Sequence, residues 1–584
     1  MATRRDVLKF GLASAAYTGV PKPASSNLLF PDGFQPSWVY DPSPPATPFV
    51  APLFEMPVAR PVPPGALDPA PDPLRHQRFD EFPPEKYYIQ RVQEFLWQYH
   101  PEPPYDQGTW SWGFNGTTPG ETFHVNYRDG QNVGGAFVRR INELPPVGQQ
   151  RARFALPSVT LHLHNGHQAS ESDGIPMDFF GPGEFWDHHY PTFPAGFDDR
   201  EKLSTLWYHD HRLDFTAPNV YAGLSGFHLH FDEKDSNDET DTRAGAFRLP
   251  SGRYDVPLML HDVKFDQSGQ VVWDFFTPTA DPTDPPPFPN SDYSYTVNGM
   301  LGDRFTVNRT IQPYFRVEAR KYRFRILNGG PSRFYDLSLR ADSRLGRRAR
   351  RGERFYMLST DGNLLPEPLI KRHITLAVAQ RHDVVIDFSH FRPGDRVYLV
   401  NRLEMREDGA GPTGRYLDEG DLIMRFDVVP RQHRDRSRIP DHMRDLPPIN
   451  FDEVRRERLF VFDYDNGLWT INGKLMDPNR VDAAIEQGSA EIWTWRNAGN
   501  AWSHPIHSHF EEFQILERNG KPLSHHDVQR SRKDVLALGP NDEVKLFMRW
   551  RDFLGKHVMH CHNVVHEDHA MMIRWDIVPP GEGD

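Results

Sequence analysis

The segment 555–562 reads Gly-Lys-His-Val-Met-His-Cys-His, and the segment 394–401 repeats its pattern, at an offset of 161 residues, as Gly-Asp-Arg-Val-Tyr-Leu-Val-Asn. Gly and Val keep their places, whereas His-Cys-His in the later copy is Leu-Val-Asn in the earlier one. A second match, at an offset of 160, aligns 376–384 with 536–544. The first part of the chain offers Trp-Tyr-His-Asp-His at the corresponding place, residues 207–211. One strand is therefore predicted to recur three times with different chemistry.

Asn-Gly pairs mark turns at a similar spacing. Asn115-Gly116, Asn298-Gly299 and Asn472-Gly473 each precede a predicted strand that ends in Asn, at Asn142, Asn328 and Asn497. Asn-Gly beside alternating apolar residues is a strong hairpin signal, and regularly spaced strands are typical of β-sandwiches. We therefore expect an all-β chain of three related domains, at residues 27–235, 236–430 and 431–584.

Histidines concentrate in pairs of the form His-x-His. In a strand, alternate side chains point to the same face, roughly 6.6 Å apart, so each pair can direct two imidazoles to one place. Four pairs amount to eight imidazoles, which could enclose a multinuclear metal centre between the first and third domains. The pairs are His162 with His164, His209 with His211, His507 with His509, and His560 with His562.

The only cysteine lies between two of these histidines. Pleating turns Cys561 away from the cluster that His560 and His562 serve, so it can ligate a separate metal. Together with His504, His566 and Met571 it makes a His₂Cys set with a weak thioether ligand, which is the blue-copper coordination type.

Composition excludes several classes of protein. The chain has 584 residues, a net charge of −13 and one Cys. A single Cys cannot form an intrachain disulfide, a Cys-rich zinc site or an iron–sulfur cluster. The acidic balance argues against nucleic acid as a partner, and we interpret the arginine run at 340–351 as a solvated loop.

The N-terminus resembles an export signal. Arg4-Arg5 precedes a short uncharged stretch, Phe10 to Val20, and then small residues. We expect a twin-arginine-type signal at 1–26 and a periplasmic or extracellular protein. The Pro-rich stretch from Pro36 to about Pro84 is expected to be an extended leader on the surface. No later stretch is long and apolar enough to predict a membrane span.

The four histidine segments resemble the copper motifs of the multicopper oxidases. The neighbouring residues agree, with Glu171-Ser172-Asp173-Gly174 after the first motif and Asn219-Val220-Tyr221-Ala222-Gly223-Leu224 after the second. The similarity covers essentially the whole chain after the leader, and is greatest to spore-coat laccases, then to bilirubin oxidases and phenoxazinone synthases. One departure is Asn165, where the first motif commonly has Gly.

This resemblance implies three cupredoxin-like Greek-key β-sandwiches and four copper ions. It assigns His504, Cys561, His566 and Met571 to the type 1 copper, and His162 and His507 to the type 2 copper. The remaining six cluster histidines fall to the two type 3 coppers, namely His164, His209, His211, His509, His560 and His562.

The function that the resemblance implies is a laccase-like oxidase. Small aromatic reductants would give single electrons at the type 1 copper, with His566 presenting its ring edge to them, and O₂ would be reduced to water. Two carboxylates, Asp173 and Glu567, match acidic positions of the laccases and are expected to deliver protons; the alternatives are a turn residue and a surface charge. We expect a monomer.

Other functions remain open at this point. A bilirubin oxidase, or a Cu(I) or Mn(II) oxidase, would use the same coppers, although the 14 Met form no Met-rich tract of the cuprous type. A non-enzymatic envelope scaffold would be expected to have lost ligands. A two-domain nitrite reductase would lack the middle unit.

Overall fold

The computed structural model describes residues 42–127, 135–273, 276–278, 293–295, 298–342, 352–465, 467–524 and 527–584. The expected export signal and the part of the arginine run at 344–351 lie outside the described residues. The predicted all-β class is confirmed, because strands dominate and the two α-helices of the described part are short: α2 (Thr216–Ala222) and α4 (Val564–Asp568).

The first unit pairs two four-stranded sheets, ordered β2-β1-β4-β6 and β3-β8-β7-β5. Val138 of the first sheet and Leu161 and Leu206 of the second belong to one buried apolar cluster, so the sheets form a sandwich. The strands are β1 (Pro84–Trp97), β2 (Thr109–Phe114), β3 (Phe123–Asn126), β4 (Gly135–Asn142), β5 (Leu161–His164), β6 (Phe185–Tyr190), β7 (Thr205–Asp210) and β8 (Ser225–Phe231).

The middle unit pairs a seven-stranded sheet, β13-β12-β9-β15-β20-β17-β18, with a five-stranded sheet, β14-β22-β21-β16-β19. Phe324 and Val384 meet Leu399 and Phe426 in its core. Its strands are β9 (Asp255–Val263), β12 (Arg304–Val307), β13 (Thr310–Ile311), β14 (Tyr314–Glu318), β15 (Lys321–Asn328), β16 (Tyr335–Ala341), β17 (Phe355–Thr360), β18 (Asn363–Lys371), β19 (His373–Leu376), β20 (Arg381–Asp387), β21 (Arg396–Met405) and β22 (Pro412–Val429), with a separate pair β10 (Phe276–Pro278) and β11 (Tyr293–Tyr295).

The last unit repeats this arrangement. A sheet ordered β24-β23-β26-β32-β28-β29, with β30 beside β28, faces the sheet β25-β34-β33-β27-β31. Trp493 and Leu546 pack with Ile506 and Ile573 between them. The strands are β23 (Val454–Asp465), β24 (Leu468–Ile471), β25 (Ala483–Glu486), β26 (Ser489–Asn497), β27 (His504–Ser508), β28 (Phe513–Arg518), β29 (Lys521–Pro522), β30 (Arg532–Lys533), β31 (Val535–Leu538), β32 (Glu543–Trp550), β33 (Gly555–Cys561) and β34 (Met572–Val578).

The three units share one strand topology. In each, one strand lies between two antiparallel neighbours: β7 between β8 and β5, β21 between β22 and β16, and β33 between β34 and β27. These are the strands that the sequence repeat aligned. The predicted domain boundaries at 235/236 and 430/431 fall between β8 and β9 and between β22 and β23; they stay a prediction.

The buried Asn that ends a strand has the same role in each unit. Asn142, Asn328 and Asn497 end β4, β15 and β26 and bond to backbone groups of the loops that follow. These side chains satisfy buried polar groups that the sheets leave free.

The turn prediction was wrong for the middle unit. Asn115 and Asn472 have φ of 49° and 52°, and each side chain bonds a neighbouring strand. In the middle unit the residue with that conformation and those bonds is Asn308, with φ of 49°. Asn298, ten residues earlier, contacts the last unit instead.

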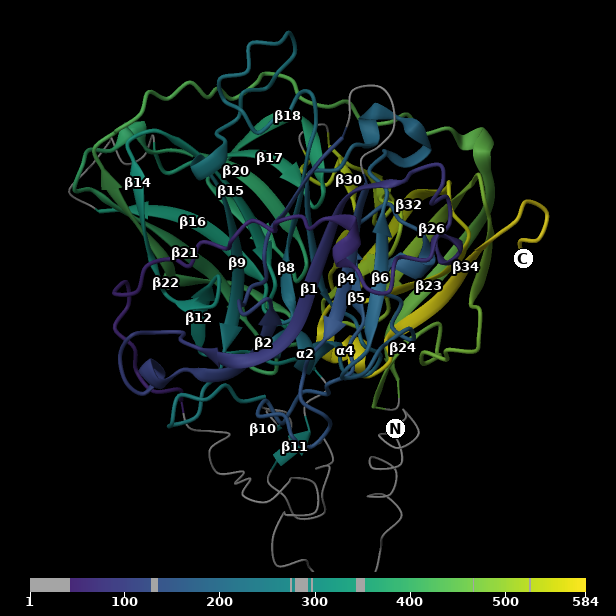
Figure 1. Cartoon of the computed structure of the whole chain (residues 1–584), viewed down its shortest axis with the longest axis horizontal. Coiled ribbons are helices and arrows are strands. Elements are labelled where there is room, and N and C mark those ends of the chain that lie inside the picture. The colour runs from purple at the N-terminus through teal and green to yellow at the C-terminus, as the bar shows by residue number, and fades with distance from the viewer. Residues whose placement is uncertain are drawn as a thin grey trace, which may run out of the picture.

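Figure 1 shows the middle unit on the left, the last unit on the right and the strands of the first unit between them. From residue 42, where its description begins, the leader forms only isolated bridges, turns and two short 3-10 helices, Pro64–Ala66 and Pro73–Arg75. It bridges to the middle unit at Tyr314 and to the first unit at Thr122 and Tyr87. These bridges connect the described part of this segment to two units, and the expected surface leader stays a prediction.

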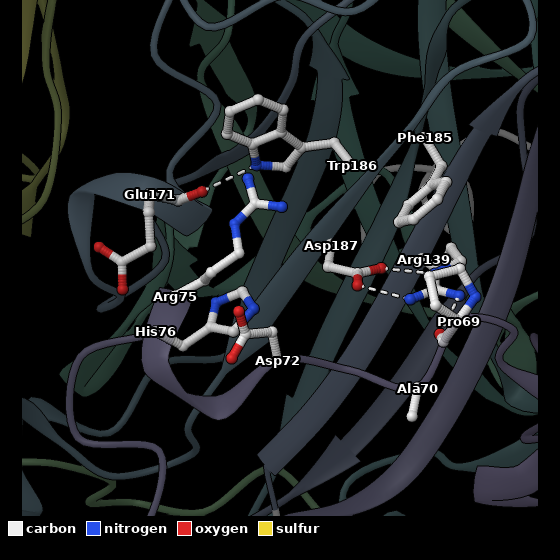
Figure 2. Close-up of a pocket in the computed structure, with 10 residues that line it drawn as sticks. All are labelled: Pro69, Ala70, Asp72, Arg75, His76, Arg139, Glu171, Phe185, Trp186 and Asp187. Carbon is white, nitrogen blue, oxygen red and sulfur yellow. Dashed lines mark hydrogen bonds and ion pairs between the residues drawn. The ribbon is translucent and has the colours of Figure 1, made fainter.

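The leader also covers the edge of β6. A cavity of about 120 Å³ lies there. Figure 2 shows residues that line it, from the leader and from the strands β4 and β6. Arg139 donates to the Pro69 carbonyl (2.7 Å) and to both carboxylate oxygens of Asp187 (2.7 Å each). Within the described residues, no helix has the length and apolar character needed to cross a membrane.

Candidate metal centre

Eight histidines meet where the first and last units touch. The β5–β7 pairing sets His162 opposite His209, and the β27–β33 pairing sets His507 opposite His560. The two units then close on each other, because the rings of His162 and His509 stack with their centroids 3.8 Å apart. All eight side chains are buried: His162, His164, His209, His211, His507, His509, His560 and His562.

Neighbouring protein groups orient these rings. Nδ1 of His162 donates to the carbonyl of Asp173 (2.6 Å), that of His209 to Asp210 (2.7 Å), and that of His507 to Asp534 (2.8 Å). Histidines that bind a metal usually donate their other ring nitrogen to a protein acceptor in this way. The opposite ring nitrogens are therefore free for a metal.

Those nitrogens converge. Nε2 of His162 lies 3.4 Å from Nε2 of His507, and Nε2 of His211 lies 3.1 Å from Nε2 of both His509 and His560. Among the described residues, Nε2 of His209, Nδ1 of His164 and both ring nitrogens of His562 have no hydrogen-bond partner although they are buried. Buried ring nitrogens without partners are costly unless a metal takes them.

Burial also keeps the histidine rings in their neutral form. Burial lowers the pKa of His211 to about 4 and the pKa of His164, His209 and His507 well below the ordinary value. Neutral imidazole is the form that binds a metal. Three all-histidine sets have ligand atoms that lie within 4.8 Å of one another: His162, His164 and His209; His162, His507 and His509; and His211, His509 and His560. The residues present therefore fit more than one copper ion.

Cys561 points to the other side of β33. Its Sγ lies 3.5 Å from Nδ1 of both His504 and His566, and those two nitrogens are 3.2 Å apart. Burial raises the pKa of the Cys561 thiol well above its ordinary value, and lowers the pKa of His504 to about 3. A cation at this point would stabilise the thiolate, so the donor set fits a soft metal such as copper.

Met571 reaches the same site through the backbone. Its N–H donates to the carbonyl of His566 (3.0 Å), and its carbonyl accepts the N–H of Cys561 (3.1 Å). The Met571 side chain is fully buried in the core cluster that contains Cys561. His504 of β27, Cys561 and His566 are thus brought together, and Met571 is tied by its backbone to Cys561 and His566; its role as a ligand stays a prediction.

The ring edge of His566 is covered, which differs from the expectation that it meets the substrate. Nε2 donates to the carbonyl of Asn298 from the middle unit (2.7 Å), and the side chain is 0% exposed. The backbone carbonyl takes the place that a substrate would need. The sequence contained no local signal for this long-range contact.

Both predicted carboxylates lie against the histidine cluster. The Glu567 oxygens are 3.1 Å from Nδ1 of His211 and of His560. Asp173 Oδ2 accepts from Nδ1 of His509 (2.8 Å). Glu567 is 2% exposed and Asp173 is 0% exposed, so neither the surface charge nor the simple turn explains them.

A third carboxylate, not predicted from the sequence, also lies against the histidine cluster. Asp534 Oδ1 lies 3.1 Å from Nε2 of His164, and Arg381 of the middle unit donates to both Asp534 oxygens (2.6 and 2.7 Å). Lys533 donates to Asp361, also of the middle unit (2.7 Å). The one available signal was the charged run Arg532-Lys533-Asp534 directly before the apolar strand β31.

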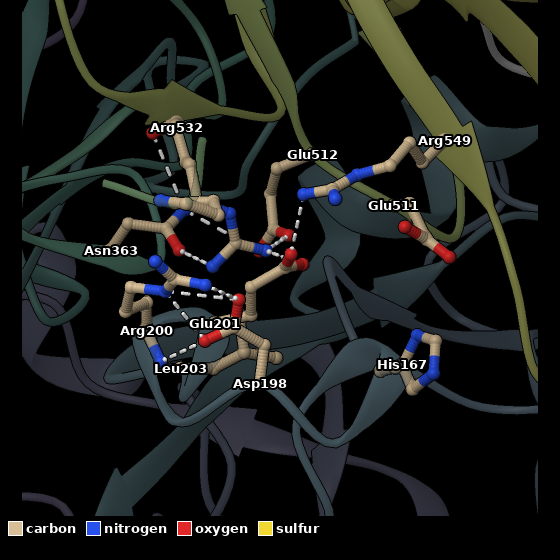
Figure 3. Close-up of polar contacts among 12 residues, drawn as sticks. His167, Asp198, Arg200, Glu201, Leu203, Asn363, Glu511, Glu512, Arg532 and Arg549 are labelled. Carbon is tan, nitrogen blue, oxygen red and sulfur yellow. Dashed lines mark hydrogen bonds and ion pairs between the residues drawn. The ribbon is translucent and has the colours of Figure 1, made fainter. Parts of the chain in front are cut away.

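Asn165, the departure from the family motif, adopts φ of 68°, in the left-handed region that Gly favours and Asn tolerates. Its Nδ2 donates to Glu512 Oε1 (2.6 Å). Glu512 belongs to a buried charge cluster shown in Figure 3, in which Arg532 contacts both Glu512 and Glu201, and Arg549 also contacts Glu201. The cluster joins the first and last units beside the metal centre.

Comparisons with known proteins agree with this geometry. A multicopper oxidase family profile matches residues 450–581. The chain is 30% identical to a laccase of Bacillus subtilis over 85% of this chain and 94% of that protein. It is 31% identical to a bilirubin oxidase of Albifimbria verrucaria, over 83% of this chain and 75% of that protein.

Solved structures share the fold. A laccase from Pediococcus acidilactici superposes with a TM-score of 0.69 at 23% identity, covering 92% of this chain and 96% of that one. A multicopper oxidase from Aquifex aeolicus gives a TM-score of 0.66 at 23% identity, covering 85% of this chain and 97% of that one.

Proposed function

The chain belongs to the multicopper oxidase family, and from that premise we propose how its residues serve a laccase-like oxidase that couples one-electron oxidation of aromatic reductants to reduction of O₂. The observation that carries the proposal is the strand end 560–562. Its single thiol joins His504 and His566 on one side, and its two flanking histidines join the eight-histidine cluster on the other.

We assign the ligands of four copper ions as the resemblance implies. His504, Cys561, His566 and Met571 would hold the type 1 ion, and His162 and His507 would hold the type 2 ion. The six other histidines would hold the type 3 pair: His164, His209, His211, His509, His560 and His562. Copper bound there would supply the one-electron chemistry that couples oxidation of the reductant to the four-electron reduction of O₂ to water.

The protein supplies geometry and a short covalent connection. Because His560 and His562 are the sequence neighbours of Cys561, the backbone of β33 joins the two metal sites directly. The hydrogen bonds that the rings donate to the carbonyls of Asp173, Asp210 and Asp534 fix which ring nitrogen faces the cluster. Fixed rings in a buried site exclude water and bind metal with little reorganisation.

Glu567 and Asp173 serve as proton carriers in this proposal. Carboxylate oxygens can accept protons, and those of both residues lie within 3.1 Å of a cluster histidine. The oxygens are Oε1 and Oε2 of Glu567 and Oδ2 of Asp173. Reduction of O₂ to water consumes protons, and few other groups this close to the cluster can relay them. Asp534 is held by Arg381 and is better suited to orienting His164.

We further propose the domain boundaries 27–235, 236–430 and 431–584, export by the signal at 1–26, and a monomeric state. The strand positions support the boundaries. Mass determination of the secreted protein and its elution volume on gel filtration test the other two.

The function is tested with copper-loaded protein and a panel of reductants, namely 2,6-dimethoxyphenol, bilirubin, Cu(I) and Mn(II), while O₂ uptake is followed. We expect the phenol to be oxidised with four electrons per O₂ consumed. A strong preference for Cu(I) or Mn(II) over every organic reductant would contradict the laccase assignment, and a preference for bilirubin would narrow it.

A further inference from the structure

The buried ring of His566 leaves open how an electron reaches the type 1 ligands. The Asn298 carbonyl contacts its Nε2 at 2.7 Å, and Nδ2 of Asn563 lies 3.1 Å from the same atom. A phenol could therefore touch this ring edge only by displacing the middle unit. Another group of this chain must lie between His566 and the reductant.

That group is Trp469 of β24. Its indole stacks on the His566 ring with the centroids 3.9 Å apart and the planes 23° from parallel. The same indole meets the ring of His504 edge to face, at 5.3 Å and 77°. Trp469 is 0% exposed, so one buried ring contacts both histidines of the Cys561 site.

Two further rings lead from Trp469 towards the surface. Tyr464 lies 4.5 Å and Trp502 lies 5.3 Å from the Trp469 ring, and the two are 5.1 Å apart. Both are only partly buried, and the neighbouring Leu468 is 41% exposed. The rings form a continuous aromatic path, Tyr464 and Trp502 outside, Trp469 inside, His566 at its end.

We propose that Trp469 is the electron-entry residue and that Tyr464 and Trp502 form the surface on which an aromatic reductant stacks. The inference rests on the proposed oxidase function and names the substrate face of that site. Planar aromatic reductants pack favourably on such rings. Docking on an open aromatic surface, without insertion beside His566, also admits reductants too large for a pocket.

The electron balance is simple. Each reductant molecule loses one electron and, if it is a phenol, releases its proton to solvent. The metal held by Cys561 gains that electron, and no bond of Trp469 forms or breaks. Four such events supply the electrons that convert one O₂ and four protons to two waters.

Packing alone is the competing explanation for Trp469, and Trp495 is the matched control. Trp495 lies in the same core cluster, is also 0% exposed, and its ring packs against Phe513 (5.1 Å) and Phe462 (6.3 Å). A Trp-to-Phe change at either site removes a similar volume from the same core.

The test is anaerobic stopped-flow reduction of copper-loaded Trp469→Phe, followed as loss of the blue absorption. The reductants are 2,6-dimethoxyphenol and the small inorganic ion hexacyanoferrate(II). We expect the rate constant to fall by roughly tenfold with both, which is about 1.4 kcal/mol of activation free energy. The blue absorption and the reduction potential should stay at wild-type values, and Trp495→Phe should reduce at the wild-type rate.

The surface rings give a graded check. Tyr464→Leu and Trp502→Leu should each slow reduction by the phenol less than Trp469→Phe does, because the other ring remains. The double variant should approach Trp469→Phe. If Trp469→Phe does not load copper, as judged from its blue absorption, Trp469→Tyr replaces it with the same expected direction.

Three results would overturn the proposal: reduction of Trp469→Phe at the wild-type rate, equal slowing in Trp495→Phe, or a shift of potential that accounts for the whole loss. Failure of the proposed function looks different. In that case the wild-type protein, loaded with copper, consumes no O₂ with any reductant of the panel.

Discussion

The strands β21 and β33 occupy the same place in sheets of the same topology, yet of the two only β33 carries residues that we propose as metal ligands. In β21, Asn401 Oδ1 accepts from the backbone of Asp336 (3.0 Å) and Leu403 (3.2 Å), so its polar groups are used within its own unit. At the equivalent position, one residue after β33, both ring nitrogens of His562 have no hydrogen-bond partner among the described residues. The fold thus supplies the position, and the side chain decides between structure and metal binding.

The two strands also end differently. β33 ends at Cys561 and the chain turns into α4, which carries His566 and Glu567. β21 continues as a strand to Met405. The turn into a helix is what brings two more functional side chains back against the end of β33.

The largest expected effect is at the centre of the comparison. Cys561→Ser should abolish the blue absorption and the oxidase activity, because no other thiol exists in the chain. Val400→Ser, at the equivalent position of β21, should keep both and lose only about 1–3 kcal/mol of stability through burial of a hydroxyl. Absorption spectra and O₂ uptake measure the two effects. A Cys561→Ser protein that stays blue would contradict the assignment of Cys561 as the copper thiolate.

The next two variants compare an effect on copper content with an effect on the free energy of unfolding. His562→Ala should lower the ratio of copper to protein, measured by elemental analysis, while the blue absorption persists. Asn401→Ala should keep its copper but lower the free energy of unfolding by about 2–4 kcal/mol, because two backbone N–H groups lose their acceptor. Equal copper loss in both variants would mean that the two positions are not distinguished by chemistry.

The proposed proton-carrying role of the α4 helix is tested by changing its carboxylate, Glu567. Glu567→Gln should keep copper and colour but slow O₂ reduction, so that reoxidation of the fully reduced enzyme becomes the slow step. Asp173→Asn should do the same. Stopped-flow reoxidation at the wild-type rate in both variants would leave these residues with a structural role only.

The middle unit has a pH sensitivity of its own. Burial lowers the pKa of His382 to about 4, and its Nε2–H donates to the Thr375 carbonyl (3.0 Å). Since the unfolded residue titrates near 6.5, the stability that the neutral ring provides is complete above that pH and is lost as the pH falls towards 4, by up to about 3 kcal/mol. His382→Gln should flatten this fall in urea titrations at pH 7 and 4.5. An equally steep fall in the variant would exclude His382 as its source.

The smallest effect is expected at Met571. Met571→Leu removes the weak thioether donor and makes the site drier, so the reduction potential of the blue copper should rise. Met424→Leu, in the buried core of the middle unit, serves as the control and should leave the potential unchanged. A lowered potential in a redox titration of Met571→Leu would count against the ligand assignment.

Most of the metal centre could be predicted from local pattern. His-x-His pairs, and a thiol between two histidines, already specify which face of a strand each side chain takes, because side chains alternate along β-structure. The repeat likewise identified β7, β21 and β33 as equivalent strands. Both predictions depend only on neighbours along the chain or on a fixed offset.

Other features depended on contacts between distant segments. The Asn298-Gly299 pair looks like the other two Asn-Gly turns, yet the turn of the middle unit forms at Asn308 and Asn298 instead closes over His566. Arg381 reaches Asp534 across a unit boundary, and Trp469 stacks on a ring 97 positions further along the chain. Such contacts arise when whole sandwiches pack, and packing depends on the shapes of complete surfaces. The amino-acid order therefore determines the ligand set and the repeated sandwich, whereas only the packed units decide which ligands are covered, held and connected to the surface.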